Sequence, residues 1–230
     1  MSVPARIAVL ASGGGSNLQA LIDRFHPDPH ASARVALVIA SRDGIGAIGR
    51  AERAGIDAVV LDARAVTADE FRDSFLAALD THRIDLVVLA GWLQLVPAEV
   101  VARYHGRMIN IHPALLPAFG GHGMYGMRVH RAVIQSGARV SGATVHLVNE
   151  RYDEGAILAQ WPVPVLPDDT PEALAARVLA VEHRLLPLAV EAIALHARPL
   201  PSGSGPLAFG LMDGAPDDDS MRRAIRLPDA

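Results

Sequence analysis

Short apolar segments alternate with helical segments over the first 112 residues, and this alternation limits the folds open to the chain. The apolar segments carry hydrophobic residues on both faces and cover residues 6–12, 33–41, 58–62, 85–91 and 107–112. Segments with helical spacing separate them, over residues 17–25, 47–55, 68–82 and 97–105. Strands that are apolar on both faces and joined through helices are typical of parallel sheets with helices on both sides. The sequence therefore predicts an α/β fold with a doubly wound, mostly parallel sheet.

The rhythm changes after residue 112. A helix is expected over 127–137, followed by strands over 141–148 and 156–165 that are joined by the loop "NERYDEG". We expect these two strands to extend the sheet in antiparallel fashion. A long helix over 170–197 should follow, with Thr170 as its cap, Pro171 in its first turn and a kink near Pro187.

These segments predict one domain over residues 1–197 and a tail over 198–230. The domain is expected to have an N-terminal half over about 1–105 and a second half over about 106–197. The tail is rich in Pro, Gly, Ser and Asp, which predicts a loose or only peripherally packed segment.

Composition excludes several classes of function. The formal net charge is -4, with acidic and basic residues interspersed, so neither nucleic acid nor an anionic membrane is indicated as a partner. The absence of cysteine excludes disulfides, thiolate nucleophiles and cysteine-based zinc sites. The chain also has no lysine, which excludes Schiff-base enzymes and the P-loop of nucleotide hydrolases. No metal site is expected from the spacing of the histidines.

The first residues, "MSVPARIAVLASGGG", hold too short an apolar run for a secretory signal, and no segment is long enough to span a membrane. A cytoplasmic enzyme or binding protein that acts on small molecules is therefore expected.

The glycine-rich stretch "ASGGGSNLQ" joins the first predicted strand to the first predicted helix. The amides of Gly15, Ser16 and Asn17 lie at a helix N-terminus, where an anion is favoured. A dinucleotide fits poorly, because Leu18 replaces the third glycine of the usual motif and the second strand ends without a strong acidic candidate. A phosphate monoester is the preferred ligand. The alternative is a tight turn that Ser16 or Asn17 caps.

A polar pair, Asn110 and His112, stands at the end of the fifth predicted strand, "RMINIH". Residues two apart on a strand share a face, and open α/β sheets bind ligands at the carboxyl ends of their strands. Asn offers an amide donor to a developing oxyanion, and His carries protons near neutral pH. Asp153 is the best carboxylate to accompany them, with Glu150 and Glu154 as rivals. A carboxylate beside the imidazole would raise its pKa.

Several motifs together resemble the phosphoribosylglycinamide formyltransferases of purine biosynthesis. They are "GGGSNLQALI", "LVVLAGWLQLV", "INIHPALLPAF", "YDEGAILAQ" and "VEHRLLP", which occur in the family's order and cover about residues 6–197. The Asn-x-His-Pro run with a later Asp-x-Gly is shared by all formyltetrahydrofolate-hydrolase-like domains. The "GSNLQ" turn is more specific to the glycinamide enzymes.

The resemblance implies a Rossmann-like formyltransferase fold and formyl transfer from 10-formyltetrahydrofolate to the amine of phosphoribosylglycinamide, without a metal. It implies three sets of site residues. The catalytic set is Asn110, His112 and Asp153. The set for phosphoribosylglycinamide is Gly15, Ser16, Asn17, Pro113 and Glu182. The folate set is Leu93, Gln94, Leu95 and Val96 together with Asn110, Asn149, Glu150, Arg151, Tyr152 and Asp153.

Two departures from the family pattern stand out. The glycine-rich run over 120–128 is longer than the family's usual "Pro-Gly-Leu-His" segment, and its contacts are left open. An expected folate-contacting Arg aligns with Ala68, which leaves Arg64 and Arg72 as replacements.

Two rival functions remain open at this point. A formyltetrahydrofolate deformylase would use the same catalytic set but hydrolyse the formyl group. A non-catalytic phosphate- or nucleotide-binding module would need only the glycine loop. Either a monomer or a homodimer is compatible with the sequence.

Overall fold

The structure is a computed structural model that describes residues 3–195 and 218–225. Among these residues, seven strands form one sheet in the order β3-β2-β1-β4-β5-β6-β7. The strands are β1 Ala5–Ala11, β2 Ala33–Ala40, β3 Ala58–Val60, β4 Leu86–Leu89, β5 Met108–His112, β6 Val140–Leu147 and β7 Ile157–Pro164. The pairs β1–β2, β1–β4 and β2–β3 are parallel, and β6–β7 is antiparallel. The predicted sheet and its antiparallel extension are both confirmed.

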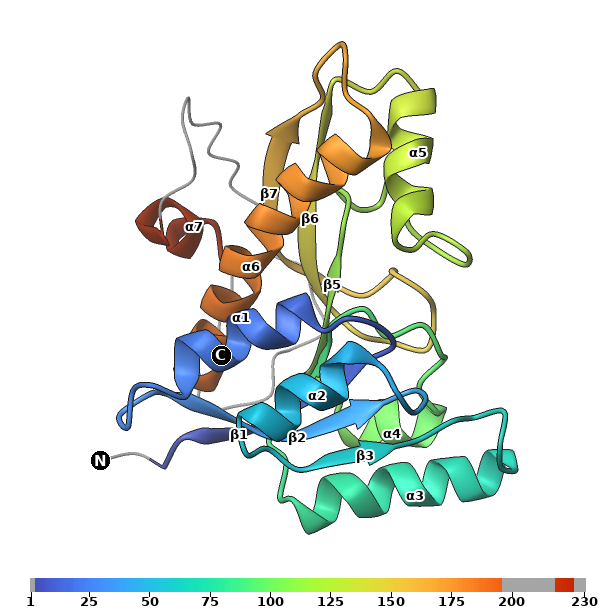
Figure 1. Cartoon of the computed structure of the whole chain (residues 1–230), viewed down its shortest axis with the longest axis vertical. Helices are drawn as coiled ribbons and strands as arrows, with labels where there is room; N and C mark the ends of the chain where they lie inside the picture. The colour runs from blue at the N-terminus through green and yellow to red at the C-terminus, as the bar shows by residue number, and fades with distance from the viewer. Residues whose placement is uncertain (1–2, 196–217, 226–230) are drawn as a thin grey trace. The chain divides into compact units, whose positions relative to one another are not determined.

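Contacts divide the chain into two compact units, residues 1–109 and 110–230, which are described separately. The first unit holds four helices: α1 Ser16–Phe25, α2 Gly46–Arg53, α3 Ala68–Thr81 and α4 Ala98–Arg103. In Figure 1, α1 and α2 lie on one side of strands β1 to β3, and α3 lies on the other side. The strands β1 and β2 are almost fully buried between these layers. Hydrophobic burial on both faces explains why these strands lack the polar alternation of a half-exposed sheet.

Local capping sets the boundaries of α3. Thr67 accepts a hydrogen bond from the Glu70 amide, and the Glu70 carboxylate accepts one from the Thr67 amide. This reciprocal capping box satisfies backbone donors that the first turn of a helix leaves unpaired. Threonine is one of the residue types that are favoured at the N-cap of a helix, which explains why α3 begins directly after Thr67.

The described part of the second unit holds the end of β5, the strands β6 and β7, and three helices: α5 Met127–Gln135, α6 Pro171–Leu195 and α7 Asp218–Ala224. Helix α6 packs on β6 and β7 and also contacts α5 and α7, as Figure 1 shows. The Thr170 hydroxyl accepts a hydrogen bond from the Ala173 amide, which confirms the predicted cap. The helix runs without interruption through Pro187, and the expected kink stays a prediction.

The tail contains a helix that was not predicted. Residues 198–217 and 226–230 of the tail lie outside the described residues, but α7 forms and its Met221 side chain is fully buried. Asp218 pairs with Arg184 of α6 at 2.9 Å, and Arg222 pairs with Glu191 of α6 at 3.1 Å. A loose tail is therefore wrong for residues 218–224, whereas packing at the periphery of α6 agrees with the expectation. Over the described ranges, no helix is long and apolar enough to cross a membrane.

Candidate active site

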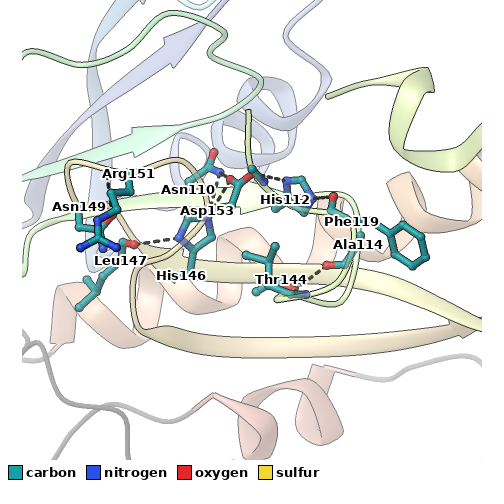
Figure 2. Close-up of polar contacts among 12 residues, drawn as sticks. Asn110, His112, Ala114, Phe119, Thr144, His146, Leu147, Asn149, Arg151 and Asp153 are labelled. Atoms are coloured by element: carbon teal, nitrogen blue, oxygen red, sulfur yellow. Dashed lines mark hydrogen bonds and ion pairs between the residues drawn. The ribbon is translucent and has the colours of Figure 1, made fainter. Parts of the chain in front are cut away.

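His112 is the most enclosed member of the predicted catalytic set. Only 3% of the side chain is exposed, and its Nε2 lies 2.9 Å from the carbonyl oxygen of Phe119. Because a carbonyl oxygen can only accept, Nε2 carries a hydrogen and donates it. The other ring nitrogen, Nδ1, faces Asp153 Oδ2 at 3.5 Å (Figure 2). Nδ1 is therefore the atom of His112 that can gain or lose a proton.

Burial decides the charge of His112 at rest. Removal of the imidazole from water lowers its pKa below 6.5, and this outweighs the raising effects of the Asp153 charge and the Phe119 carbonyl. Asp153 raises the pKa of His112, as expected from the sequence, but the larger effect of burial makes the net shift downward. The resting imidazole is neutral near pH 7.

Asp153 is held from several sides. Its backbone has φ 59°, which is uncommon for a residue with a side chain. The Gly121 amide donates a hydrogen bond to Oδ2 at 2.9 Å. Burial raises the pKa of the carboxyl, but the neighbouring His146 and His112 imidazoles and the hydrogen bond from the Gly121 amide together bring it below 3.8. Asp153 is thus an anion at neutral pH.

The rival carboxylates face elsewhere. Glu150 and Glu154 are both exposed, and Glu154 pairs with Arg151 at 2.9 Å. Of the three acidic residues in this loop, Asp153 is the one that the structure places beside the imidazoles (Figure 2).

Asn110 lies on β5 next to Asp153, on the same side of the strand as His112 (Figure 2). Its Nδ2 donates to His146 Nε2 at 3.0 Å and makes a longer contact of 3.4 Å with Asp153 Oδ1. The structure therefore brings all three predicted catalytic residues together within the second unit. The Asn110 amide has two hydrogens, one for the bond to His146 and one for the longer contact with Asp153.

His146 is a site residue that the sequence analysis missed. It is 2% exposed, its Nδ1 donates to the Leu147 carbonyl at 2.8 Å, and its Nε2 accepts from Asn110 and lies 3.6 Å from Asp153 Oδ1. A signal was present in the strand "SGATVHLV", where Thr144 and His146 alternate with apolar residues. Two polar residues on one face of an otherwise apolar strand indicate a buried polar network.

Thr144 is the second missed residue and it orders the segment that follows His112. Its hydroxyl donates to the Ala114 carbonyl at 2.6 Å and accepts from the Leu116 amide at 3.1 Å. Gln160 Nε2 donates both to the Leu116 carbonyl, at 2.8 Å, and to Thr144 Oγ1, at 3.0 Å. All of these groups are buried, so the hydrogen bonds fix the backbone that directly follows His112.

Two glycines allow the loops to approach so closely. A Cβ on Gly155 would lie 1.6 Å from the Leu147 carbonyl oxygen, which is the acceptor of His146. A Cβ on Gly120 would lie 2.4 Å from Leu116 Cδ2. The glycine-rich run over 120–128 thus reaches the site through Gly120 and Gly121. In the same run, His122 makes an edge contact with Tyr152, with ring centroids 5.7 Å apart.

The glycine loop belongs to the first unit. Helix α1 begins at Ser16, and its cap Gly15 has φ 73° and no side-chain capping bond. A Cβ on Gly15 would lie 2.9 Å from Ala47, so both conformation and space require glycine there. The cap residue of α1 is thus Gly15 rather than Ser16 or Asn17, and the choice between an anion site and a simple tight turn stays a prediction. Beside the loop lies a cavity of about 370 Å³ lined by Gly13, Gly14, Arg42, Asp43, Gly44, Ile45 and Gly46.

The segment after β4 joins this loop. Ser12 Oγ accepts from the Leu93 amide at 3.0 Å, and Gln94 Nε2 donates to the Ser41 carbonyl at 3.1 Å. Leu93 and Leu95 are about half exposed, at 50% and 53%, whereas Val96 is in the core. Of the four residues expected to contact folate here, Leu93 and Leu95 expose apolar side chains. The Gln94 side chain instead connects two loops. The Val96 side chain is buried, so only its backbone is available to a ligand.

The remaining predicted residues occupy separate positions. Glu182 is buried in α6, and Pro113 is half-buried directly after His112. Arg64 pairs with Asp62 at 2.8 Å, and Arg72 pairs with Asp69 at 2.6 Å. Both candidates for the folate-contacting Arg thus have carboxylate partners in this structure.

Comparison with known proteins identifies the family. A model of the formyl transferase family matches residues 5–190. The chain belongs to this family, and the resemblance seen in the sequence is confirmed.

Individual relatives are similar over most of the chain. The chain is 45% identical to the chloroplastic phosphoribosylglycinamide formyltransferase of Arabidopsis thaliana, over 82% of this chain and 65% of that protein. It is 42% identical to phosphoribosylglycinamide formyltransferase of Mycobacterium tuberculosis, over 85% and 87%. The crystal structure of glycinamide ribonucleotide transformylase 1 from Symbiobacterium toebii superposes with a TM-score of 0.77 at 40% identity, covering 84% of this chain and 89% of that one. The chain thus spans less than two thirds of the plant relative.

Proposed function

We propose that this chain transfers the formyl group of 10-formyltetrahydrofolate to the amine of N1-(5-phosphoribosyl)glycinamide, a step of de novo purine (IMP) biosynthesis. The products are the N-formyl compound and tetrahydrofolate. The observation that carries the proposal is the placement of Asn110 and Asp153 beside the buried, neutral imidazole of His112. The names of the relatives and their coverage in the bacterial proteins support the choice of acceptor.

The chemistry follows from the protonation states. The glycinamide amine attacks the formyl carbon and gives a tetrahedral intermediate with negative charge on oxygen. Neutral His112 takes the proton that the amine must lose, at Nδ1, because Nε2 is already engaged by the Phe119 carbonyl. The imidazolium that forms lies 3.5 Å from the Asp153 carboxylate, which stabilises it.

Collapse of the intermediate needs a donor for the oxyanion and a proton for the leaving group. The Asn110 Nδ2 hydrogen that makes only the long 3.4 Å contact with Asp153 turns to the oxyanion, which the protonated His112 also stabilises. His112, with a water held by Asp153, returns the proton to N10 of the folate as the carbon–nitrogen bond breaks. No covalent enzyme intermediate is needed.

Substrate contacts are assigned by the matched motifs. The amides of Gly15, Ser16 and Asn17 bind the ribose-linked phosphate, which fits the uncapped N-terminus of α1. Pro113 and Glu182 contact the glycinamide part. The folate contacts Leu93, Gln94, Leu95, Val96, Asn110 and the loop over 149–153. In this proposal the protein works on small molecules in the cytoplasm, as a monomer or homodimer, with neither nucleic acid nor membrane as a partner.

The decisive test follows folate absorbance with and without N1-(5-phosphoribosyl)glycinamide. The proposal predicts turnover only when the glycinamide is present. Equal turnover without it would identify a deformylase, and no turnover in either case would favour a phosphate- or nucleotide-binding module.

A further inference from the structure

Two helix-to-strand turns in the first unit line a cavity of about 300 Å³, and none of its lining residues has a role in the proposed formyl transfer. The end of α3 and the turn after it contribute Asp80, Arg83 and Ile84. The end of α4 and the turn after it contribute Arg103, Tyr104 and Arg107. The Val87 amide donates to the Arg107 carbonyl, so the two turns are adjacent. Both turns precede their strands, whereas the glycine loop follows β1, which is parallel to β4. The cavity therefore lies at the end of the sheet opposite the glycine loop.

The cavity wall carries an excess of positive charge. Three guanidinium groups face one carboxylate, and Arg103 already donates to Asp80 Oδ1 at 2.8 Å. Among the lining residues, Arg83 and Arg107 have no carboxylate partner of their own. The Asp85 carboxylate, whose charge also reaches Tyr104, accepts a hydrogen bond from the Arg6 amide. The chain as a whole has a formal net charge of -4, so the positive charge of the cavity wall is opposite in sign to the net charge of the protein. An anion is attracted to such a place by the local field.

Arg107 is held ready for an acceptor. Its guanidinium lies over the Tyr104 ring, 5.0 Å from the centroid, and one terminal nitrogen donates to the Arg103 carbonyl at 2.9 Å. The Tyr104 hydroxyl in turn donates to the Ile84 carbonyl at 3.2 Å, which ties the ring to the other turn. Within the described part of the chain, the buried Arg107 Nε has no acceptor. A buried N–H without an acceptor calls for an explanation, such as a bound anion.

Arg83 occupies a position where glycine is usual. It follows the end of α3 with φ 48°, and its amide donates to the Asp80 carbonyl. Glycine is preferred at such a helix end because it has no Cβ to clash in the left-handed region. An arginine at this position is sterically unfavourable, yet it places an exposed guanidinium on the cavity wall. Such outliers concentrate at functional sites.

We propose that this cavity binds a phosphate group, either as free phosphate or on a small phosphorylated metabolite. Guanidinium forks match phosphate oxygens in geometry and charge. Arg83 and Arg107 supply the donors, and Tyr104 holds Arg107 in place. The site is separate from the glycine loop, and the proposal does not depend on the reaction that the enzyme catalyses.

The test is a titration of the full-length protein followed by amide NMR, with inorganic phosphate and glycerol 3-phosphate as probes. Potassium chloride at matched ionic strength is the control. We expect saturable shifts at the amides of Arg83, Ile84 and Arg107, with a midpoint separate from that of Gly13 to Ser16. Tighter binding of glycerol 3-phosphate would assign a phosphorylated metabolite, and equal or tighter binding of phosphate would assign the free ion.

Variants make the result specific to the cavity. Arg107→Gln should weaken phosphate binding at the cavity amides by about 10-fold, because it removes a charge-assisted contact. Arg83→Gly should weaken it similarly while the melting temperature stays unchanged or rises, since glycine suits φ 48°. Arg53→Gln, on the exposed face of α2, is the matched control and should change nothing. Shifts that do not saturate, or that persist in both cavity variants, would show an adventitious ion only and overturn the proposal.

Discussion

At the scale of single residues, the proposed reaction depends most on His112. Its burial keeps the imidazole neutral, and its Nε2 bond to Phe119 leaves Nδ1 as the working atom. His112→Ala should lower kcat by about 10²- to 10⁴-fold, because it removes the general acid–base group. Steady-state kinetics with saturating glycinamide substrate would check this. A variant that retains a near-normal rate would remove His112 from the mechanism.

His146 acts through Asn110 in this account. Removing it leaves the Asn110 amide without its 3.0 Å acceptor, and losing one partner of a buried hydrogen bond costs about 1–3 kcal/mol. His146→Ala should therefore lower kcat by about 10- to 100-fold, with little change in KM for the glycinamide substrate. His146→Gln, which keeps an acceptor, should restore part of the loss, and His105→Ala at an exposed position should have no effect. A loss that appears only in KM would contradict a positioning role.

Single residues could be predicted from the sequence where a polar side chain stands at a position whose direction is fixed by strand periodicity. Asn110 and His112 could be paired because strand periodicity puts i and i+2 on one face. The net pKa of His112 could not be foreseen, because the balance between burial and the Asp153 charge depends on packing. His146 was missed because it belongs to a segment without a motif, and its partners stand 36 and 7 residues away in the sequence.

At the scale of elements, the link between β6 and β7 holds the site together. It carries Asp153 and brings Gly155 against the Leu147 carbonyl, which is the acceptor of His146. Gly155→Ala would force a Cβ to within 1.6 Å of that oxygen, so the loop must move. The variant should lose at least about 1–3 kcal/mol of stability, as overpacked cores do, together with activity. Urea unfolding and kinetics on the same preparation would measure both.

A matched control exists within α2. Gly49→Ala places the new Cβ near the flexible end of Arg53, at 3.4 Å, and alanine favours the helix by about 0.5–1 kcal/mol. Gly49→Ala should therefore be neutral or stabilising. If Gly155→Ala were equally harmless, the close approach of the two loops would not matter for folding or for the site.

Element boundaries were predictable where capping chemistry is explicit, as at Thr67 and Thr170. Helix α7 was not predictable, because a short helix in a Pro- and Gly-rich tail is stable only when it packs against another element, here α6. A weak helical signal is present in this segment: an acidic first turn at Asp218 and Asp219, and apolar residues four apart at Met221 and Ile225. This signal gives no information on the partner of the helix. Its ion pairs with α6 are contacts between distant parts of the chain.

At the scale of the whole molecule, buried titratable groups link stability to pH. Burial lowers the pKa of His112 and of His130 below 6.5 in the folded state. Below pH 6.5 the unfolded chain therefore binds protons that the folded chain does not, and stability falls as the pH drops toward the folded-state pKa values. The lowered pKa of Asp153 adds a further loss below pH 3.8.

The measurement is the free energy of unfolding by urea at several pH values between about 7.5 and 5. The wild type should lose stability across this range, and His112→Gln should lose less because one of the depressed imidazoles is gone. His30→Gln, in an exposed loop, should keep the full loss. A pH profile that His112→Gln leaves unchanged would mean that the imidazole is not kept neutral by folding.

The fold class was predictable from the whole sequence because strand–helix alternation is a global pattern and the parallel ladders follow from it. The acceptor depends on motifs nearly a hundred residues apart, the glycine loop and the Asn-x-His pair. Their joint presence could be read from the sequence. The family match agrees with formyl transfer as the class of reaction, and the acceptor is part of the proposed function.

The central claim is that the formyl carbon ends on the glycinamide nitrogen. A single-turnover reaction with formyl-¹³C-labelled 10-formyltetrahydrofolate and N1-(5-phosphoribosyl)glycinamide, analysed by mass spectrometry, follows that carbon directly. The account predicts that the label appears in the N-formyl product, with one tetrahydrofolate formed for each label transferred. Label recovered as free formate, with the glycinamide unchanged, would contradict it.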